Sequence, residues 1–299
     1  MPVFLKRALP VLTAVALLVA LVPGPASSAP ARNLNVEWLT GYPSPGTPAQ
    51  YNRVGVLKVG PSSAKNVLVL EPGTSAGSTY FVPLAKWIVS QVSGWQVWSV
   101  ERRENLLEDQ SVLNRFKDGQ ATSTELYNYY LGYLKDPSVS PHFQTIPTAS
   151  VEFAKDWGMN VAVQDLHDVI AAARRLGGKV VLGGHSLGGA VVTAYAAWDF
   201  HGVAGAHDLA GLVYIDGGSL PAVSAATARS ELSGLDSSGT SPWLTFGGIP
   251  APFAGLFSAT GATAALIDPN SQSLGQSSGL LGAFHLTPSV PVTNLAQFG

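Results

Sequence analysis

The chain has 299 residues, and 46% of them are hydrophobic, which is enough to bury one large α/β core. Only 12% are charged, the net charge is −2 and the 17 lysines and arginines are scattered, so no basic stripe is offered to nucleic acid. The absence of cysteine excludes a disulfide framework and a cysteine-linked lipid anchor, and is more typical of a bacterial secreted enzyme than of a eukaryotic one.

The first 31 residues are predicted to form a secretory signal peptide. Lys6 and Arg7 supply its positive start, and an apolar stretch at residues 8–22 follows. Small residues after that stretch favour cleavage behind Ala31, with Ala29 as a competing site. The alternative is a membrane anchor, but about 15 apolar residues fall short of the roughly 20 that a span needs. We therefore expect an exported, extracellular protein without a stable membrane span after cleavage.

Strand and helix patterns alternate between residues 54 and 215. Residues 32–52, rich in Pro, Gly and Tyr, are expected to form an irregular arm. Strands are predicted from short, apolar, β-branched runs at residues 54–59, 66–70, 95–100, 179–182 and 209–215. Helices are predicted at residues 80–92, 124–134, 159–176 and 190–200. This alternation predicts an α/β fold with a doubly wound, mostly parallel sheet.

The sequence changes character after residue 216. It becomes rich in Gly, Ser, Pro and Ala, and short helices are expected at residues 221–232, 253–257 and 262–267. No terminal helix is expected at residues 292–299. We interpret residues 220–299 as a cap over an α/β core at residues 32–219. Four phenylalanines in the cap would either favour a hydrophobic substrate or simply pack the cap: Phe246, Phe253, Phe257 and Phe284.

The segment from Gly183 to Gly189 carries the clearest chemical signal. It reads Gly-Gly-His-Ser-Leu-Gly-Gly and lies between a short strand and a helix. Gly184 and Gly188 leave room for a tight turn, because glycine tolerates dihedral angles that a Cβ forbids. Such a turn lifts Ser186 to the carboxyl end of its strand, where open α/β sheets place their sites. The next helix directs its free N–H groups and its positive dipole end at the same point.

This Gly-x-Ser-x-Gly turn, in its strand and helix context, resembles the nucleophile elbow of the α/β-hydrolase superfamily. Within it, the chain is most similar to secreted bacterial lipases and esterases. The resemblance implies that Ser186 is the nucleophile and that the backbone N–H of Leu187 is one oxyanion donor. The second donor would come from the loop after an earlier strand. Thr74 is the first choice and Ser75 the second, although Pro72 stands where relatives carry a histidine.

The family order of nucleophile, acid and histidine points to Asp216 and His285 as the other triad members. Asp216 ends the strand after the elbow helix, although a turn or cap role would also suit it, and Asp236 and Asp268 are further aspartates downstream. His285 is chosen because the other histidines precede Asp216: His142, His167, His185, His201 and His207. The family fold would also continue with two further strands that the sequence does not reveal. Either the fold closes unusually or the chain is a truncated fragment.

We therefore expect a serine hydrolase that cleaves carboxylic esters of small molecules or lipids through an acyl-enzyme. Acyltransferases and peptidases of the same fold stay open as alternatives, as does a non-catalytic or truncated member. A surface adhesion protein fits the Gly/Ser-rich tail but not the elbow. No metal, phosphate loop or other cofactor site is predicted, since Asp165, His167 and Asp168 point in different directions on one helix.

Overall fold

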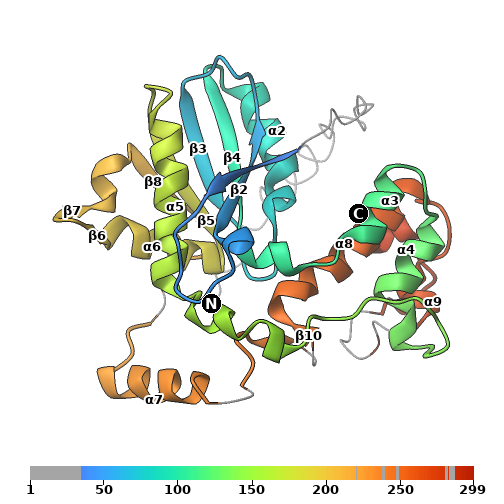
Figure 1. Ribbon diagram of the computed structural model, residues 1–299. Coiled ribbons are helices and arrows are strands. Elements are labelled where there is room, and N and C mark those ends of the chain that lie inside the picture. The colour runs from blue at the N-terminus through green and yellow to red at the C-terminus, as the bar shows by residue number, and fades with distance from the viewer. Residues whose placement is uncertain (1–34, 220, 238–239, 247–248, 280–281, 283–286) are drawn as a thin grey trace, which may run out of the picture. The chain divides into compact units, whose positions relative to one another are not determined.

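The computed structural model describes residues 35–299 except 220, 238–239, 247–248, 280–281 and 283–286. Its largest sheet has six strands in the order β1-β2-β4-β3-β5-β8 (Figure 1). The strands are β1 (Val36–Thr40), β2 (Arg53–Val59), β3 (Asn66–Glu71), β4 (Trp95–Glu101), β5 (Val180–His185) and β8 (Gly211–Ile215). β3, β4, β5 and β8 run parallel to one another, and β2 runs antiparallel to both of its neighbours. The predicted α/β fold with a mostly parallel sheet is confirmed.

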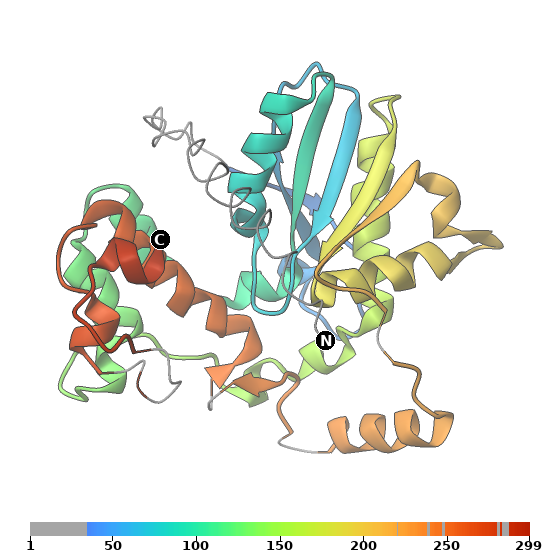
Figure 2. The same cartoon turned by 180° about the vertical axis from the view of Figure 1, so that it is seen from behind.

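Helices cover both faces of this sheet. α5 (Met159–Arg174) and α6 (Leu187–Ala197) pack on one face, and α2 (Val82–Gln91) lies on the other (Figures 1 and 2). The inner strands are rich in buried valine and leucine because both of their faces are covered. α5 presents apolar residues at helical spacing to the same core: Val163, Leu166, Val169, Ile170 and Ala173. This core fixes the carboxyl ends of β3, β4 and β5 beside one another.

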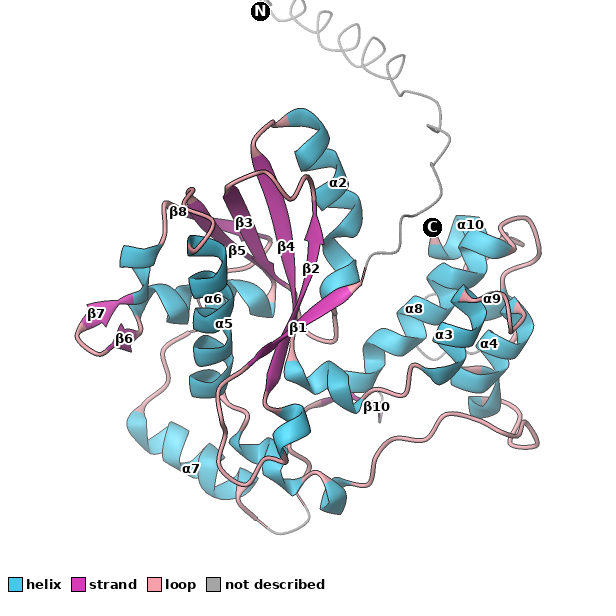
Figure 3. Cartoon of the chain, turned by 45° about the horizontal axis from the view of Figure 1, so that its top comes forward, coloured by secondary structure: helices cyan, strands magenta, loops and turns pink. Residues whose placement is uncertain are grey.

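A second apolar cluster joins two stretches that are distant in the sequence. α4 (Ser123–Tyr130) packs against α8 (Ala251–Ile267), which also contacts α10 (Asn294–Phe298) (Figure 3). The short helices α3 (Ser111–Lys117) and α9 (Leu274–Ser277) pack with these, α3 on α4 and α9 on α8 and α10. We call this second apolar core the cap cluster, and its buried members are Leu107, Val112, Phe116, Leu126, Tyr130, Phe143, Val151, Phe253 and Leu256.

The cap cluster takes side chains from both sides of position 220. Phe143 lies 5.9 Å from Phe253 and 6.2 Å from Phe257 between ring centroids, so these two cap phenylalanines pack against another part of the chain. The side chains of Phe246 and Phe284 lie outside the described residues. The division into a core at 32–219 and a cap at 220–299 stays a prediction, since the cap cluster also draws on residues 107–151.

Three local predictions were wrong. Residues 36–40 form β1, which pairs with β2 in the register Val36 to Leu57, so the expected arm contains an edge strand. The two short helices expected at 253–257 and 262–267 are one helix, α8, because its packing on α4 and α10 overrides the low helix propensity of its glycines and threonines. The end of the chain forms α10, which Thr293 caps by accepting a hydrogen bond from the N–H of Ala296 at 3.2 Å.

Beyond Ser219, the described residues contain no strand of the main sheet. β9 (Thr245–Phe246) and β10 (Ile249–Pro250) pair only with each other, and β6 (Asp199–Phe200) pairs with β7 (Val203–Ala204) before β8. The helix α7 (Ala225–Leu235) has no buried residue. Within the part of the chain that is described, no helix combines the length and apolar character that crossing a membrane requires.

Candidate active site

The turn between β5 and α6 holds Ser186 in a strained backbone conformation. Its φ is 52° and its ψ is −119°, which for a residue with a side chain is a costly combination. The serine lies immediately before the first residue of α6, and its side chain is exposed to solvent. A strained, exposed serine at the start of a helix is the geometry that the sequence predicted for this position.

The glycines around the serine are required because backbone meets backbone there. A Cβ on Gly184 would lie 2.3 Å from the carbonyl group of Gly188, and one on Gly188 would lie 2.2 Å from the carbonyl oxygen of Glu71. A Cβ on Gly217, just after β8, would lie 2.6 Å from the backbone N of Ser186. Real Cβ atoms do not approach other atoms this closely, so the turn can form only with glycine at these positions.

The loop after β3 passes directly beside the elbow. Glu71 pairs with Gly184 in the sheet, so the chain leaving β3 emerges next to the chain leaving β5. A Cβ on Gly73 would lie 3.1 Å from the Cβ of Ser186. The following residue, Thr74, is exposed, and its N–H makes no hydrogen bond within the described residues. The N–H of Leu187, the residue after Ser186, likewise has no hydrogen-bond partner there, so the N–H groups of both predicted oxyanion donors are unpaired within the described residues.

Ser75, the second choice for an oxyanion donor, has another contact. Its φ is 60°, and its hydroxyl donates a 2.5 Å hydrogen bond to the carbonyl oxygen of Ala251, the first residue of α8. Gly255, one turn further along α8, leaves room for this approach, because a Cβ there would lie 2.2 Å from the carbonyl oxygen of Ser75. The loop beside Ser186 is thus joined directly to α8, which contributes side chains to the cap cluster.

Three charged side chains that the sequence analysis did not single out hold this loop. Arg102 donates hydrogen bonds of 2.8 Å to the carbonyl oxygens of both Pro72 and Gly73. Glu71 lies 3.3 Å from the Arg102 guanidinium. Glu101 accepts a 2.5 Å hydrogen bond from the N–H of Ser78, at the far end of the loop. Glu71 and Glu101 are the last residues of β3 and β4, and Arg102 directly follows β4. These strand-end positions were the one available signal, but only the sheet order brings β4 beside β3.

Asp216 directly follows β8 and adopts a left-handed conformation with φ of 44°. The backbone N–H of Ser186 bonds to the carbonyl oxygen of Ile215 at 3.3 Å, which brings the end of β8 against the elbow. Asp216 is exposed, and its carboxylate has no hydrogen-bond partner within the described residues. The two other aspartates end helices: Asp236 follows α7, and Asp268 follows α8 and accepts a hydrogen bond from Ser271 at 2.6 Å.

The predicted base, His285, lies outside the described residues. Three other histidines have structural contacts. His185 stacks on Tyr80 with ring centroids 5.0 Å apart, His167 stacks on Phe200 at 4.1 Å, and His142 stacks on Tyr133 at 4.4 Å. In the ranges that the structure describes, no histidine hydrogen-bonds to the Ser186 hydroxyl.

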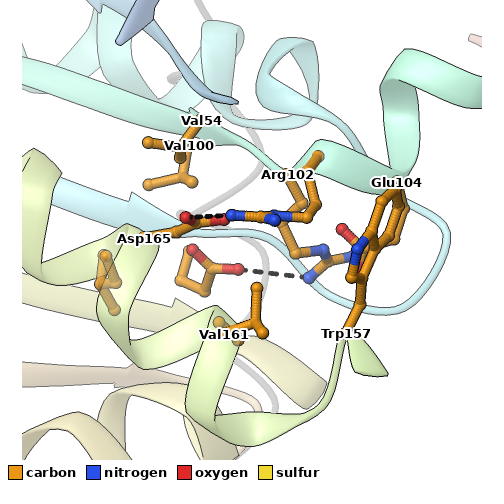
Figure 4. A pocket seen from close by; sticks show the side chains of 11 residues that line it. Val54, Val100, Arg102, Glu104, Trp157, Val161 and Asp165 are labelled. Carbon is orange, nitrogen blue, oxygen red and sulfur yellow. Dashed lines mark hydrogen bonds and ion pairs between the residues drawn. The ribbon is translucent and has the colours of Figure 1, made fainter. Parts of the chain in front are cut away.

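A pocket beside the loop is lined by paired charges together with apolar side chains. Figure 4 shows Arg102, Glu104, Trp157 and Asp165 around it. Arg103 forms a bidentate ion pair with Asp165, at 2.7 Å and 2.5 Å. Burial raises the pKa of Glu71 to about 7, although the Arg102 guanidinium opposes this rise. Among the described residues, no group of three histidines or carboxylates could hold a metal ion.

Comparison with known sequences identifies the fold family. The model of the alpha/beta hydrolase family matches residues 68–294, which is more than half of the chain, so the chain belongs to this family. The match spans the loop after β3, the turn that holds Ser186, and Asp216. No protein with a curated description matches the sequence significantly.

Solved structures offer more distant likenesses. One is a protein of Sulfolobus solfataricus provisionally described as a lipase, at 15% identity and a TM-score of 0.43, with 84% of this chain and 64% of that chain covered. Another is the thioesterase domain from the curacin biosynthetic pathway, at 15% identity and a TM-score of 0.38, with 90% of this chain and 76% of that one covered. The chain therefore spans less than two thirds of the length of the Sulfolobus protein.

Proposed function

We propose that this chain is a serine hydrolase that cleaves carboxylic esters through an acyl-enzyme formed on Ser186. The observation that carries the proposal is the strained, exposed Ser186 at the start of α6, against which the loop after β3 packs at Gly73. The N–H groups of Leu187 and of Thr74, the residue after Gly73, have no hydrogen-bond partner among the described residues. A serine hydroxyl in such a turn faces a substrate carbonyl without steric obstruction from its own backbone. Two convergent N–H groups are the means by which acyl-transfer enzymes stabilise a tetrahedral oxyanion.

In the proposed reaction, the Ser186 Oγ attacks the ester carbonyl carbon while a histidine takes the hydroxyl proton. The carbonyl π electrons move to oxygen, and the Leu187 and Thr74 N–H groups bind this oxyanion. When the tetrahedral intermediate collapses, the bond to the alkoxy oxygen breaks and the histidine returns its proton to the leaving alcohol. Water then repeats the sequence on the acyl-enzyme, which yields the carboxylic acid and restores the serine.

We assign the remaining triad roles to Asp216 and His285. A carboxylate in this role holds the histidine in the correct tautomer and stabilises the imidazolium that forms. The position of Asp216, one residue from the glycine that packs against Ser186, supports this assignment. Within the described residues its carboxylate has no hydrogen-bond partner, which leaves it available to accept a hydrogen bond from an imidazole N–H.

The proposed substrates are small-molecule or lipid esters with an apolar acyl group. The hydrogen bond from the Ser75 hydroxyl to α8 supports this choice. It joins the loop at residues 72–77, which we call the oxyanion loop, to a helix with many apolar side chains.

We also propose that the protein is exported and that its signal peptide is removed after Ala31 or Ala29. Mass spectrometry of protein from the culture medium would then give an amino terminus at Arg32 or Pro30, and a retained Met1 would contradict export by this route.

The activity is tested by hydrolysis of p-nitrophenyl esters of increasing acyl length. Wild-type protein should release p-nitrophenolate, and Ser186→Ala should reduce kcat by roughly 10⁴-fold or more. Asp216→Asn and His285→Ala should each reduce kcat strongly while Asp236→Asn, on the exposed helix end, leaves it unchanged. Hydrolysis that survives in Ser186→Ala would contradict the proposal, and activity that survives in His285→Ala would overturn the assignment of the base.

A further inference from the structure

Arg102 donates hydrogen bonds to two consecutive carbonyl groups of the oxyanion loop. Its Nη1 donates to the carbonyl oxygen of Pro72 and its Nη2 to that of Gly73, each at 2.8 Å. The guanidinium is planar and rigid, so these two bonds fix the orientation of both peptide groups at once. The side chain is only 14% exposed, which limits competition from water.

The orientation of these carbonyls determines where the neighbouring N–H groups point. The carbonyl of Gly73 and the N–H of Thr74 belong to the same peptide group, and in a trans peptide the two point in opposite directions. The carbonyl of Pro72 and the N–H of Gly73 are related in the same way. Binding both carbonyls on one side therefore turns both N–H groups away from Arg102. Neither N–H has a hydrogen-bond partner among the described residues, and Gly73 lies against Ser186.

We propose that Arg102 is a positioning residue that aims the Thr74 N–H at the oxyanion by holding the carbonyl groups of Pro72 and Gly73. The inference rests on the proposed serine hydrolase function. It assigns the geometry of the oxyanion loop to a side chain on β4's carboxyl end, outside the loop itself. The described hydrogen bonds of Arg102 go to Glu71, Pro72 and Gly73 and not to Ser186, so we assign its effect on the reaction to the peptide groups that it holds.

Glu71 and the sheet pairing keep Arg102 in this position. Leu70 pairs with Ser99, so β3 and β4 end side by side and Arg102 starts close to Pro72. The buried side chain of Glu71, whose Oε1 lies 3.3 Å from Nη1, contacts the guanidinium at the start of the loop. Arg103, the next residue, provides a natural comparison, because it bonds Asp165 and the carbonyl oxygen of Tyr42 and makes no hydrogen bond to the loop.

The test compares kcat, KM and inhibitor affinity per active site, with sites counted by fluorophosphonate titration. The variants are Arg102→Gln, Arg102→Lys and the control Arg103→Gln, with p-nitrophenyl butyrate as substrate. The inhibitor is an aryl trifluoromethyl ketone, which forms a tetrahedral oxyanion adduct with the serine. Arg102→Gln should lower kcat by about 10- to 100-fold with little change in KM, and the Ki of the ketone should rise by a similar factor.

Arg102→Lys should lie between wild type and Arg102→Gln, since an ammonium can bond one carbonyl but cannot fix two peptide planes. Arg103→Gln should lower the thermal midpoint but leave kcat and Ki per titrated site within about twofold of wild type. A purely structural role of Arg102 would reduce the number of titratable sites without changing Ki, and that result would overturn the inference. If wild-type protein neither titrates nor hydrolyses the ester, the proposed function fails and the inference fails with it.

Discussion

The elbow and the cap cluster are held together by different kinds of contact. At the elbow, Gly184 and Gly188 bring backbone atoms so close together that a single added Cβ would lie 2.3 Å or less from a carbonyl group. In the cap cluster, aromatic rings such as Phe143 and Phe253 pack at centroid distances of about 6 Å. The elbow depends on close contacts between backbone atoms, whereas the cap cluster depends on the packing of apolar side chains.

This difference predicts how each region responds to change. Main-chain contacts in a strained turn cannot relax, because the strands and helices on either side fix them. Apolar side chains can repack, so a cavity in the cap cluster costs stability without redirecting the chain. Substitutions at the elbow should therefore affect folding and activity together, while those in the cap cluster should affect mainly stability.

The largest effect is expected for Gly188→Ala. The added Cβ would meet the carbonyl oxygen of Glu71 at 2.2 Å, so either α6 or the end of β3 must move. We expect a loss of more than about 4 kcal/mol of folding free energy and of measurable esterase activity. Denaturant unfolding monitored by circular dichroism would measure it.

The matched control is Gly234→Ala in α7. That glycine is also helical, but a Cβ there would meet no atom within 4 Å. The control should be neutral or stabilising by up to about 1 kcal/mol, because alanine favours the helix. If both substitutions have the same effect, the steric account of the elbow is wrong.

The next effect is expected for Phe253→Ala in the cap cluster. Phe253 is 1% exposed and packs on Phe143 and Trp243. Its removal should cost roughly 3 kcal/mol of stability while fluorophosphonate labelling of Ser186 continues below the new unfolding midpoint. Leu266→Ala, at a side chain that is 80% exposed, should change stability by less than about 0.5 kcal/mol. A labelling rate that falls in Phe253→Ala would show that the two regions are not separable.

Glu71→Gln should change how stability depends on pH. Burial raises the pKa of Glu71 from 4.5 to about 7, so between these values the folded protein binds a proton that the unfolded chain has released. Stability contributed by this group is therefore present at pH 4.5 and is lost as the pH rises to 7. This shift in pKa corresponds to a stability change of about 3 kcal/mol at most. In Glu71→Gln, loss of the contact with Arg102 should offset about 1 kcal/mol of this change.

At pH 8 we expect the free energy of unfolding of Glu71→Gln to exceed that of wild type by roughly 2 kcal/mol. At pH 4.5 we expect no net gain, because only the loss of the Glu71 contacts then remains. The measurement is urea unfolding of both proteins at the two pH values. Burial also raises the pKa of Glu108 to about 8, but that effect is common to both proteins and cancels in the difference. A difference that does not vary with pH would contradict the raised pKa of Glu71.

The smallest effect is expected for Ser75→Ala, which removes the hydrogen bond between the oxyanion loop and α8. The bond joins the Ser75 hydroxyl to the carbonyl oxygen of Ala251 at 2.5 Å. Its loss should cost about 1 kcal/mol and raise KM more than it lowers kcat, since the loop keeps its contacts with Arg102. A matched Ser138→Ala change, at an exposed turn, should alter neither constant. A fall in kcat with unchanged KM would instead place Ser75 among the groups that act in the transition state.

The sequence predicted most of the core. The strand at 66–70 and the helix at 159–176 were located within two residues, because buried strands and an amphipathic helix leave distinct patterns. The elbow was predicted because its closest backbone contacts require glycine, and these glycines stand in the seven-residue segment from Gly183 to Gly189. The N–H groups of Leu187 and Thr74 have no hydrogen-bond partner among the described residues, and their role as oxyanion donors stays a prediction.

Features that depend on long-range pairing were not predicted. β1 is an edge strand whose residues are only partly buried, so it lacks the apolar run of an inner strand. α8 was expected as two short helices, because its glycines and threonines have low helix propensity and only packing makes it continuous. The hydrogen bonds from Arg102 to the loop after β3 could not be predicted, because they depend on β3 and β4 being neighbours in the sheet.

The central claim is that Ser186 is an activated nucleophile, and covalent labelling tests it most directly. Protein would be exposed to a fluorophosphonate beside a Ser186→Ala control and analysed by intact-mass and peptide mass spectrometry. The account predicts one adduct per chain, on Ser186, and none in the control. An unlabelled wild-type chain, or an adduct that persists in Ser186→Ala, would contradict it.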